Sequence, residues 1–383
     1  MKNILNVGIL GFGFMGKAHT FGYQTMQLYY DHLPFSVNLA AVYTRNPEKG
    51  LEAKDRIGFN YYSNNADDII NDPSIDIIDI CTPNSLHKEA LVKCIKAGKN
   101  IYCEKPMVLN MDEAQEVKAV LTEYSYSKTA QIVFHNRFFP TSLRAKELVN
   151  AGCLGKILSF RASYLNPGAS TEAAPATWRY QADIAGHGTL YDLGSHILDL
   201  LSFLLGQEFS SVTASSQIAF PARKSVDGQS TVKVAVDDAT YLIIKLKNGA
   251  MGTVECSKLA TGSSDELRYE IHGTKGALRY NSMSPNYLYF YDADMPDAMH
   301  SLGGDRGWKA IECVQHYPDP GGSFPHARSS IGWLRGHVHS LYSFCDNVYH
   351  GRPGSPSIDD GIYIQHVMDC AVRSAEKKQW VDI

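Results

Sequence analysis

Three glycines near the N-terminus constrain the fold of this chain more than any other feature. Gly11, Gly13 and Gly16 follow the apolar run at residues 7–10 and precede a helical pattern from about residue 15 to residue 29. In such a turn the first glycine permits a tight bend, the second leaves room for a pyrophosphate, and the third lets helix and strand pack closely. Free N–H groups at the start of the helix favour an anion. The pattern predicts a dinucleotide-binding loop made of Gly11, Phe12, Gly13, Phe14, Met15 and Gly16.

The pattern alone could be a chance match within a turn, but the surrounding sequence favours the first interpretation. Short apolar runs at residues 5–10, 37–43, 75–81, 100–103 and 131–134 alternate with amphipathic segments. The runs are continuous, as in parallel strands covered on both faces. Asn110 and Glu113 form a capping-box-like helix start. We expect an α/β Rossmann domain, with a doubly wound parallel sheet, over residues 1–136.

From about residue 137 the pattern changes to longer strands joined by hairpin signals. A helix is expected at residues 141–150. Asn248-Gly249 separates two strand-like runs, and Thr274-Lys275-Gly276 separates the next two. Residues 303–330, rich in Gly, Pro and His, read as a long loop. A closing helix at residues 361–377 and a short strand follow. We expect an α+β domain with a large, mostly antiparallel open sheet over residues 137–383, serving substrate binding and oligomerisation.

Composition narrows the choice of partners. The 383 residues exceed the size at which one core keeps growing, so two domains are expected. The net charge of -4 gives no electrostatic reason to expect nucleic acid or an acidic membrane. Eight cysteines form no Cys-x-x-Cys, and the 14 histidines show no metal-binding spacing. No apolar run has the length of a membrane span, and no signal peptide fits the N-terminus. We expect a cytoplasmic protein with reduced thiols, no metal and a small-molecule substrate.

The second strand bears on which dinucleotide is bound. An acidic residue near its end would accept the ribose hydroxyls and favour NAD. This segment instead carries Thr44 and Arg45, with no acid between Leu33 and Pro47. Thr44 could hydrogen-bond a 2'-phosphate, and Arg45 could pair with it or stack on adenine. The alternative is that Arg45 is a solvated loop charge. The sequence favours NADP over NAD, with either possible.

Ligands of a doubly wound sheet bind outside the carboxyl ends of its strands. Lys105 is the only cation at such an end, and it precedes Pro106. Its ammonium could polarise a substrate oxygen, or desolvation could lower its pKa. The alternative is a structural pair between Glu104 and a neighbouring cation. Residues expected at the cofactor crevice are Cys81, Thr82, Pro83, Asn84, His87, Glu104, Lys105 and Asn136.

Four motifs in this order resemble one enzyme family. They are Gly11-x-Gly13-x-x-Gly16, Cys81-Thr82-Pro83-Asn84-x-x-His87, Glu104-Lys105-Pro106 and Asp192-x-Gly194-x-His196-x-x-Asp199-Leu200. The chain resembles, over essentially its whole length, the glucose-fructose oxidoreductase / inositol dehydrogenase / rhizopine catabolism (Gfo/Idh/MocA) oxidoreductases. The resemblance implies a Rossmann domain followed by a sheet domain. It implies that Lys105 contacts nicotinamide ribose and substrate, and that Asp192 and His196 carry substrate binding and proton transfer.

The residues of the last motif have their own physical logic. Asp192 and His196 are four apart and share one face of a helix. Histidine titrates near neutrality and can take a hydroxyl proton as hydride leaves carbon. The alternative is a helix cap at Asp192 and a core histidine at His196. Asp199 is expected to pair structurally. Where the family often has three glycines, this chain has Gly186-His187-Gly188, which places an extra titratable ring near the expected substrate space.

These features predict an NAD(P)-dependent oxidoreductase that transfers hydride between a nicotinamide cofactor and a secondary alcohol of a sugar, cyclitol or related polyol. Lys105 and His196 would then meet over the nicotinamide ring. An NAD-dependent glycosidase using transient oxidation and a non-catalytic dinucleotide sensor are the alternatives. A homodimer or homotetramer through the C-terminal sheet is expected, because an open sheet face needs cover. Further substrate candidates are Tyr164, Trp178, Arg179, His187 and His337.

Overall fold

The computed structural model describes residues 3–383 and divides into two compact units. Unit 1 comprises Met1–Phe138, Tyr317–Ala327 and Gly332–Gln365, and unit 2 comprises Phe139–His316, Arg328–Ile331 and His366–Ile383. The units are discontinuous in sequence because helix α9 (Trp333–His350) packs on helix α1 (Phe14–Tyr29) of unit 1. The contiguous domain boundary at residues 136 and 137 stays a prediction. Within residues 3–383, no helix has the length and apolarity needed to cross a membrane.

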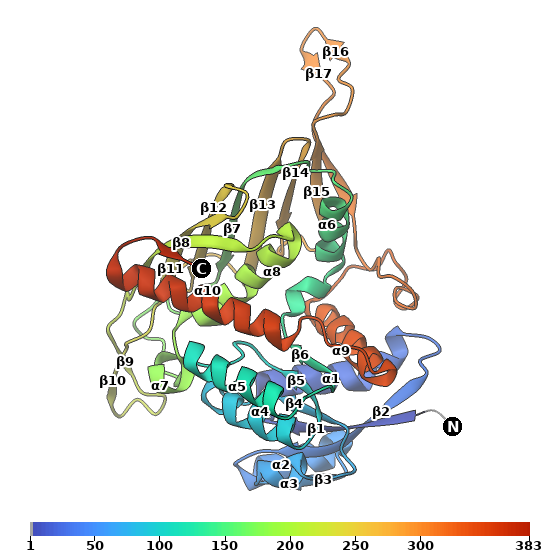
Figure 1. Cartoon of the computed structure of the whole chain (residues 1–383), viewed down its shortest axis with the longest axis vertical. Coiled ribbons are helices and arrows are strands. Elements are labelled where there is room, and N and C mark those ends of the chain that lie inside the picture. The colour runs from blue at the N-terminus through green and yellow to red at the C-terminus, as the bar shows by residue number, and fades with distance from the viewer. Residues whose placement is uncertain (1–2) are drawn as a thin grey trace. The chain divides into compact units, whose positions relative to one another are not determined.

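Unit 1 is built on a six-stranded parallel sheet (Figure 1). Its strand order is β3-β2-β1-β4-β5-β6, which confirms the predicted doubly wound arrangement. The strand missed by the sequence pattern is β3, whose three residues are too short to make an apolar run. The strands are β1 (Asn3–Leu10), β2 (Phe35–Tyr43), β3 (Tyr61–Ser63), β4 (Ile77–Ile80), β5 (Asn100–Cys103) and β6 (Ala130–Ile132).

Helices cover this sheet and bury its apolar strands. Helix α5 starts as predicted, because Asn110 Oδ1 accepts the Glu113 N–H at 2.9 Å and Glu113 Oε2 accepts the Leu109 N–H at 2.9 Å. In the core, Val7 of β1 and Phe344 of α9 are fully buried. The remaining helical elements are α2 (Pro47–Ala53), η1 (Lys54–Gly58), α3 (Ala66–Ile70), η2 (Asn84–Leu86), α4 (His87–Lys96), α5 (Met111–Glu123) and η3 (His135–Phe138).

Unit 2 is built on a nine-stranded sheet in the order β18-β15-β14-β13-β7-β12-β11-β8-β19. Only β12 and β7 pair in parallel, which confirms the predicted, mostly antiparallel sheet. Both predicted hairpins form, between β11 and β12 and between β13 and β14. The strands are β7 (Ile157–Leu165), β8 (Phe209–Gln217), β11 (Ala239–Leu246), β12 (Met251–Ser257), β13 (Glu266–Gly273), β14 (Gly276–Asn281), β15 (Tyr287–Asp292), β18 (Trp308–Glu312) and β19 (Val381–Asp382).

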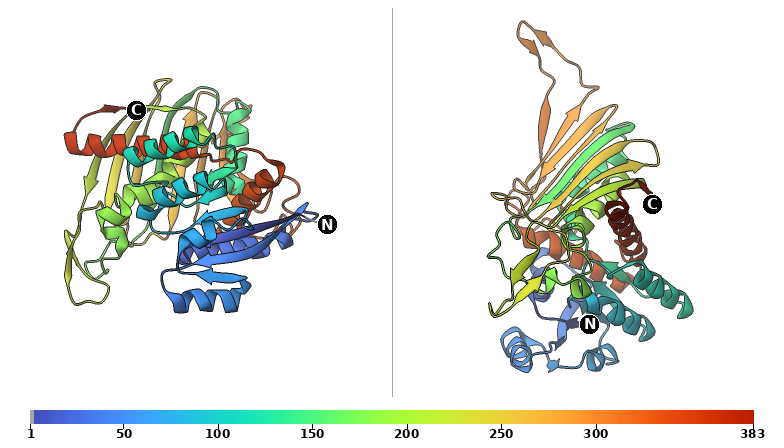
Figure 2. Two further views of the ribbon diagram at one scale, coloured as in Figure 1. Left: turned by 60° about the horizontal axis from the view of Figure 1, so that its bottom comes forward. Right: turned by 90° about the vertical axis from the view of Figure 1, so that its left-hand side faces the viewer.

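One face of the unit 2 sheet carries helices α6 (Pro140–Asn150) and α8 (Ser195–Leu205), whereas the other is open, as the two views of Figure 2 show. The alternating burial of β11 matches this arrangement: Leu242 and Ile244 are buried, and Tyr241 and Ile243 are exposed. Smaller elements are η4 (Trp178–Tyr180), α7 (Ala182–Ala185), η5 (Leu190–Gly194), β9 (Ala222–Lys224) and β10 (Thr231–Lys233). Helix α10 (Ile358–Lys377) runs from unit 1 into unit 2.

The predicted loop at residues 303–330 is wrong over its first part. Residues 303–304 form β17, which pairs with β16 (Met299–His300), and β18 follows within the expected loop. Together these strands extend the β15–β18 pair into a long hairpin arm, residues 293–307, that protrudes from the sheet (Figure 1). Gly303 and Gly304, two of the glycines that suggested a loop, form β17.

Candidate active site

The glycine loop leaves open space where a phosphate could approach. Gly11 has φ of +100°, and a Cβ there would lie 2.7 Å from the carbonyl oxygen of Cys81. A Cβ on Gly16 would lie 2.2 Å from the carbonyl oxygen of Gly11. A Cβ on Gly13, in contrast, would meet no atom within 4 Å, and α1 begins at Phe14 without a side-chain cap. The loop therefore has two glycines that packing requires and one that faces space at a helix N-terminus, which fits a pyrophosphate.

The two residues that favoured NADP lie at the end of β2. The Thr44 hydroxyl donates to the carbonyl oxygen of Asn46 at 2.5 Å, so its proton is already engaged locally. Arg45 is exposed. Asn46 caps α2 through its side chain, which accepts the Lys49 N–H at 3.0 Å. While this turn persists, Arg45 is the residue of the pair that can donate to a phosphate.

His87 connects the ends of two neighbouring strands. Its Nδ1 lies 2.9 Å from the carbonyl oxygen of Pro106, and its Nε2 lies 2.9 Å from that of Thr82. Burial lowers the pKa of His87, and the two carbonyl oxygens act in the opposite direction. Because both nitrogens face the backbone of the protein, His87 shapes the strand ends. Its predicted contact with the cofactor stays a prediction.

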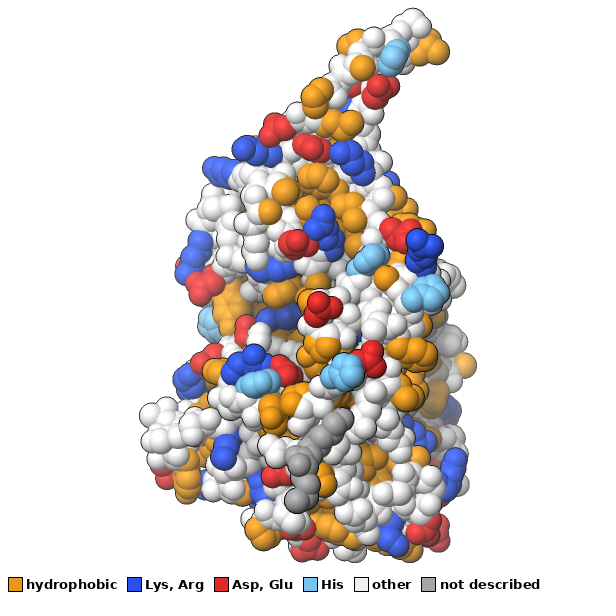
Figure 3. Space-filling model, turned by 90° about the vertical axis from the view of Figure 1, so that its right-hand side faces the viewer, with side chains coloured by type: hydrophobic (Ala, Val, Ile, Leu, Met, Phe, Trp, Pro, Cys, Tyr) orange, Lys and Arg blue, Asp and Glu red, His pale blue; other side chains and the backbone are white. Residues whose placement is uncertain are grey.

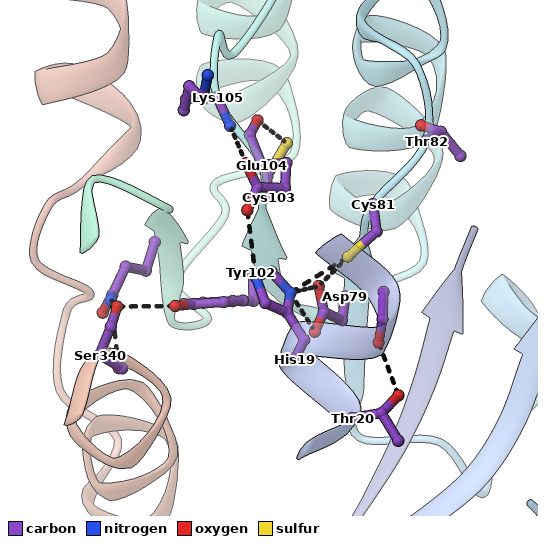
Figure 4. Close-up of polar contacts among 12 residues, drawn as sticks. His19, Thr20, Asp79, Cys81, Thr82, Tyr102, Cys103, Glu104, Lys105 and Ser340 are labelled. Carbon is purple, nitrogen blue, oxygen red and sulfur yellow. Dashed lines mark hydrogen bonds and ion pairs between the residues drawn. The ribbon is translucent and has the colours of Figure 1, made fainter. Parts of the chain in front are cut away.

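Glu104 is buried and directed towards a histidine that the sequence analysis did not single out. Its Oε1 lies 3.1 Å from His19 Nε2, and its Oε2 accepts the Lys105 N–H at 3.2 Å (Figure 4). The sequence left open that Glu104 forms a structural pair with a neighbouring cation, and His19 occupies the place of that partner. A lone histidine on an apolar helix face carries no sequence signal of such a role, which explains why it was missed.

His337 of α9 is also in unit 1 and fully buried. Its ring stacks on His135 at 3.9 Å and lies 4.3 Å from the Trp333 ring. Neither ring nitrogen has a hydrogen-bond partner within residues 3–383. Burial, together with the nearby His135 and His19, lowers the pKa of His337 well below its usual value, so the ring is neutral at pH 7. A substrate contact for His337 stays a prediction.

In unit 2, Asp192 lies within the π-helical segment η5, before α8 begins at Ser195. The backbone is already helical at Asp192, so the alternative in which it caps α8 is wrong. Its Oδ2 lies 2.8 Å from Lys258 Nζ and 3.6 Å from Arg179 Nε. Lys258 directly follows β12 and was missed, because a single lysine after a strand has no distinctive pattern. The structure thus gives Asp192 two cationic neighbours.

His196 lies in the first turn of α8 and is 5% exposed. Its ring faces that of Tyr164, with centroids 6.0 Å apart. The Tyr164 hydroxyl donates to Asp265 Oδ2 at 3.0 Å, and burial together with the Asp265 charge raises the pKa of Tyr164 well above its usual value. Tyr164 is therefore neutral beside His196.

Asp237, a third residue missed from the sequence, fixes the run that precedes the motif. Its carboxylate accepts the N–H groups of Gly188 and Leu190, both at 2.8 Å. A Cβ on Gly188 would lie 2.0 Å from the Asp237 carbonyl oxygen, so close approach requires this glycine. The half-buried His187 faces Tyr191, with ring centroids 4.9 Å apart. Arg179 stacks over Trp178 at 4.5 Å, so the two residues form one cation–π pair.

Two family models match the chain. The model described as an oxidoreductase family with an NAD-binding Rossmann fold matches residues 5–129, and the GFO/IDH/MocA C-terminal domain matches residues 142–279. The chain belongs to the Gfo/Idh/MocA oxidoreductases. This Gfo/Idh/MocA protein is an NAD(P)-dependent dehydrogenase or reductase acting on CH–OH groups, as its sequence predicted.

Gfo/Idh/MocA relatives match along the full chain. Levoglucosan dehydrogenase of Pseudarthrobacter phenanthrenivorans is 33% identical over 396 residues, covering 100% of this chain and 99% of that protein. Myo-inositol 2-dehydrogenase of Thermotoga maritima is 24% identical over 384 residues, covering 99% and 98%. A structure of levoglucosan dehydrogenase in complex with NADH and levoglucosan has a TM-score of 0.92 at 32% identity, with 100% of each chain covered.

Proposed function

We propose that this Gfo/Idh/MocA protein oxidises a secondary alcohol of a sugar, an anhydrosugar or a cyclitol, or catalyses the reverse reduction. The observation that carries the proposal is the full-length match at 33% identity to a levoglucosan dehydrogenase. The polar setting of Asp192 supports it, because a carboxylate flanked by Lys258 and Arg179 suits a ligand rich in hydroxyl groups.

Three side chains of the chain carry the proposed chemistry. The imidazole of His196 accepts the hydroxyl proton, while the ammonium of Lys105 stabilises the developing alkoxide. Asp192 orients the substrate hydroxyls. A hydride, which is one hydrogen with two electrons, leaves the alcohol carbon, and the proton leaves the hydroxyl oxygen for His196, so the C–O bond becomes a carbonyl. A nicotinamide dinucleotide bound at the glycine loop supplies the hydride acceptor.

The proposed cofactor preference is NADP over NAD, with Arg45 as the discriminating residue. Its exposed guanidinium at the end of β2 suits a bidentate pair with a 2'-phosphate. The same position offers no carboxylate to the ribose hydroxyls that NAD would present. Levoglucosan dehydrogenase has been seen in complex with NADH, and the proposed preference of this chain for NADP rests on Arg45.

The proposed assembly is a homodimer or homotetramer through the open face of the unit 2 sheet. Tyr241, Ile243 and Met251 on this face are each more than 40% exposed, next to a hollow of about 820 Å³ that Arg161 and Glu255 also line. The hairpin arm exposes further apolar side chains at its tip (Figure 3). Leu302 of this arm is fully exposed. A second copy of the chain is the partner that would cover both surfaces.

A substrate panel tests the proposed function. Levoglucosan, myo-inositol and other sugars and polyols would be oxidised with NAD and with NADP in parallel, and formation of reduced nucleotide would be followed by absorbance. The proposal expects net reduced nucleotide with at least one cyclic polyol, faster with NADP. Release of sugar from glycosides without net reduced nucleotide would instead support the glycosidase alternative.

A further inference from the structure

His19 of α1 lies between two carboxylates in the interior of unit 1. Its Nδ1 is 3.0 Å from both Oδ1 and Oδ2 of Asp79, and its Nε2 is 3.1 Å from Glu104 Oε1 (Figure 4). The side chains of His19 and Asp79 are 0% exposed, and that of Glu104 is 7% exposed. Three helical and strand elements thus bring one imidazole ring into line with two acids, and the proposed mechanism assigns none of the three a role.

The contacts of this ring define where its protons are. An ionised carboxylate only accepts hydrogen bonds, so Nδ1, which is hydrogen-bonded to Asp79, carries a proton. Nε2 lies at ion-pair distance from Glu104 Oε1, although the two atoms do not meet hydrogen-bond geometry. The Cys81 Sγ lies 3.2 Å from Nδ1 and 3.3 Å from Asp79 Oδ1. Because Nδ1 donates to Asp79, the thiol donates to Asp79 as well, and burial raises the pKa of Cys81 so that it remains a thiol. With one carboxylate within ion-pair distance of each nitrogen and a raised pKa, the ring is an imidazolium.

The surroundings favour this charge. Burial on its own lowers the pKa of His19, but the charge of Asp79 and the hydrogen bonds to Asp79 and Cys81 raise it well above the usual value. The charged groups that face the ring are the carboxylates of Asp79 and Glu104. The remaining titratable neighbours are neutral, because burial raises the pKa of the tyrosines and of the thiol and lowers that of His337. These neutral neighbours are Tyr23, Cys81, Tyr102 and His337.

The second oxygen of Glu104 links this network to Lys105. Glu104 Oε2 accepts the backbone N–H of Lys105 at 3.2 Å, while Oε1 faces His19. A carboxylate that is held at one oxygen has a fixed direction at the other. On the far side of Lys105, His87 holds the carbonyl oxygen of Pro106. The backbone on both sides of Lys105 is therefore tied to a buried histidine.

We propose that His19 is a positioning residue for Lys105, acting through the Glu104 carboxylate that its imidazolium holds in place. This inference rests on the proposed function, in which Lys105 stabilises the developing alkoxide. Positioning matters because a misplacement of about 1 Å at a reacting group can cost on the order of 100-fold in rate. The proposal gives His19 no contact with the substrate or the glycine loop. Loss of its side chain should therefore lower kcat and leave the dinucleotide Kd little changed.

Two amide variants separate positioning from a general structural role. In His19→Gln the amide nitrogen reaches the place of Nε2, next to Glu104 Oε1, and can donate to it. In His19→Asn it reaches only the place of Nδ1 and can donate to Asp79. Both variants lose the ring and its charge, so they serve as matched controls for stability. We expect His19→Asn to lower kcat at least about 10-fold relative to His19→Gln, with dinucleotide Kd and melting temperature similar in the two.

Equal kcat values in the two variants would overturn the inference. If His19→Asn does not fold, the wild-type enzyme labelled with 15N-histidine gives a second measurement. The inference expects both ring nitrogens of His19 to be protonated at pH 7 in the NMR spectrum, with the signals assigned from His19→Gln. An unprotonated nitrogen would overturn it.

The Lys105→Met variant distinguishes failure of this inference from failure of the proposed function. If Lys105→Met is inactive while His19→Asn and His19→Gln have equal kcat, only the positioning role is wrong. A fully active Lys105→Met enzyme would remove the proposed role of Lys105, and the reason for positioning it would disappear with that role.

Discussion

His87 Nδ1 lies 2.9 Å from the carbonyl oxygen of Pro106, and the same ring reaches Thr82 through Nε2. One buried side chain therefore joins the segments that follow β4 and β5. These are the carboxyl ends of neighbouring parallel strands, where a doubly wound sheet binds its ligands. The crevice thus has a rigid wall even before a ligand enters.

Replacing His87 by Ala should lower the free energy of unfolding by about 2–4 kcal/mol, because the neutral ring donates to one of the two buried carbonyl oxygens, that bond is lost and a cavity forms. Urea unfolding followed by circular dichroism measures this loss. Lys88→Ala is the matched control, since Lys88 is the next residue on α4 and its ion pair with Glu116 is at the surface. A loss below about 0.5 kcal/mol in His87→Ala would show that the ring does not hold the strand ends.

Replacing Arg45 by Ala should weaken NADP binding by about 10- to 100-fold and change NAD binding little, because a charge-assisted bond to phosphate contributes about 1.5–3 kcal/mol. Calorimetric titration with both dinucleotides gives the two Kd values. Arg56→Ala is the control, since Arg56 is an exposed arginine of the same unit that pairs with Glu52. An unchanged ratio of the two Kd values would contradict the proposed role of Arg45.

A charge on the open sheet face should dissociate the proposed oligomer. In Ile243→Asp a carboxylate would be buried without a partner at the interface, which costs several kcal/mol of association free energy. Sedimentation velocity should then give a monomer where the wild type gives a dimer or tetramer. Val226→Asp introduces the same charge in the exposed β9–β10 hairpin and should leave the oligomer intact. A monomeric wild type would contradict the assembly itself.

Unfolding of unit 1 should depend on pH through His339. Burial and the Arg335 charge lower the pKa of His339 to about 3, and its Nδ1 accepts the Tyr30 hydroxyl at 2.6 Å. Between pH 6 and pH 4.5 the unfolded chain binds a proton that the folded ring does not, so stability falls as pH falls. His19, with its raised pKa, is protonated in both states below about pH 6 and adds little slope there.

In His339→Phe the free energy of unfolding should therefore depend less on pH than in the wild type, by about 1 kcal/mol per pH unit in this range. Urea unfolding at several pH values measures it. His350→Phe serves as control, because His350 is a half-exposed ring on the same helix. Identical slopes in His339→Phe and wild type would contradict a neutral buried His339.

The secondary structure could be predicted where a few neighbouring residues determine it. Continuous apolar runs identified five of the six strands of unit 1, and Asn248-Gly249 identified the β11–β12 hairpin, because turn chemistry and burial act over a few residues. The strand β18 was hidden, because Gly303 and its neighbours resemble a loop while the pairing partner β15 lies 16 residues earlier.

The contacts that shape the site were less predictable. His19, Asp237 and Lys258 each act through a partner distant in sequence, and a single polar residue has no period or spacing that marks it. Helix α9 lies within residues 137–383, which are expected to form the second domain, and it packs on α1 of unit 1. Lys105 could be identified because strand topology alone predicts the edge of the sheet at which its residue lies.

The central claim is that Lys105 stabilises the developing alkoxide of a bound sugar or cyclitol. Its most direct test is the kcat of Lys105→Met on a polyol that the wild type oxidises, measured beside dinucleotide Kd. We expect kcat to fall by at least about 100-fold while dinucleotide Kd stays within about three-fold, and Lys88→Met to retain wild-type values of both. Wild-type kcat in Lys105→Met would contradict the account.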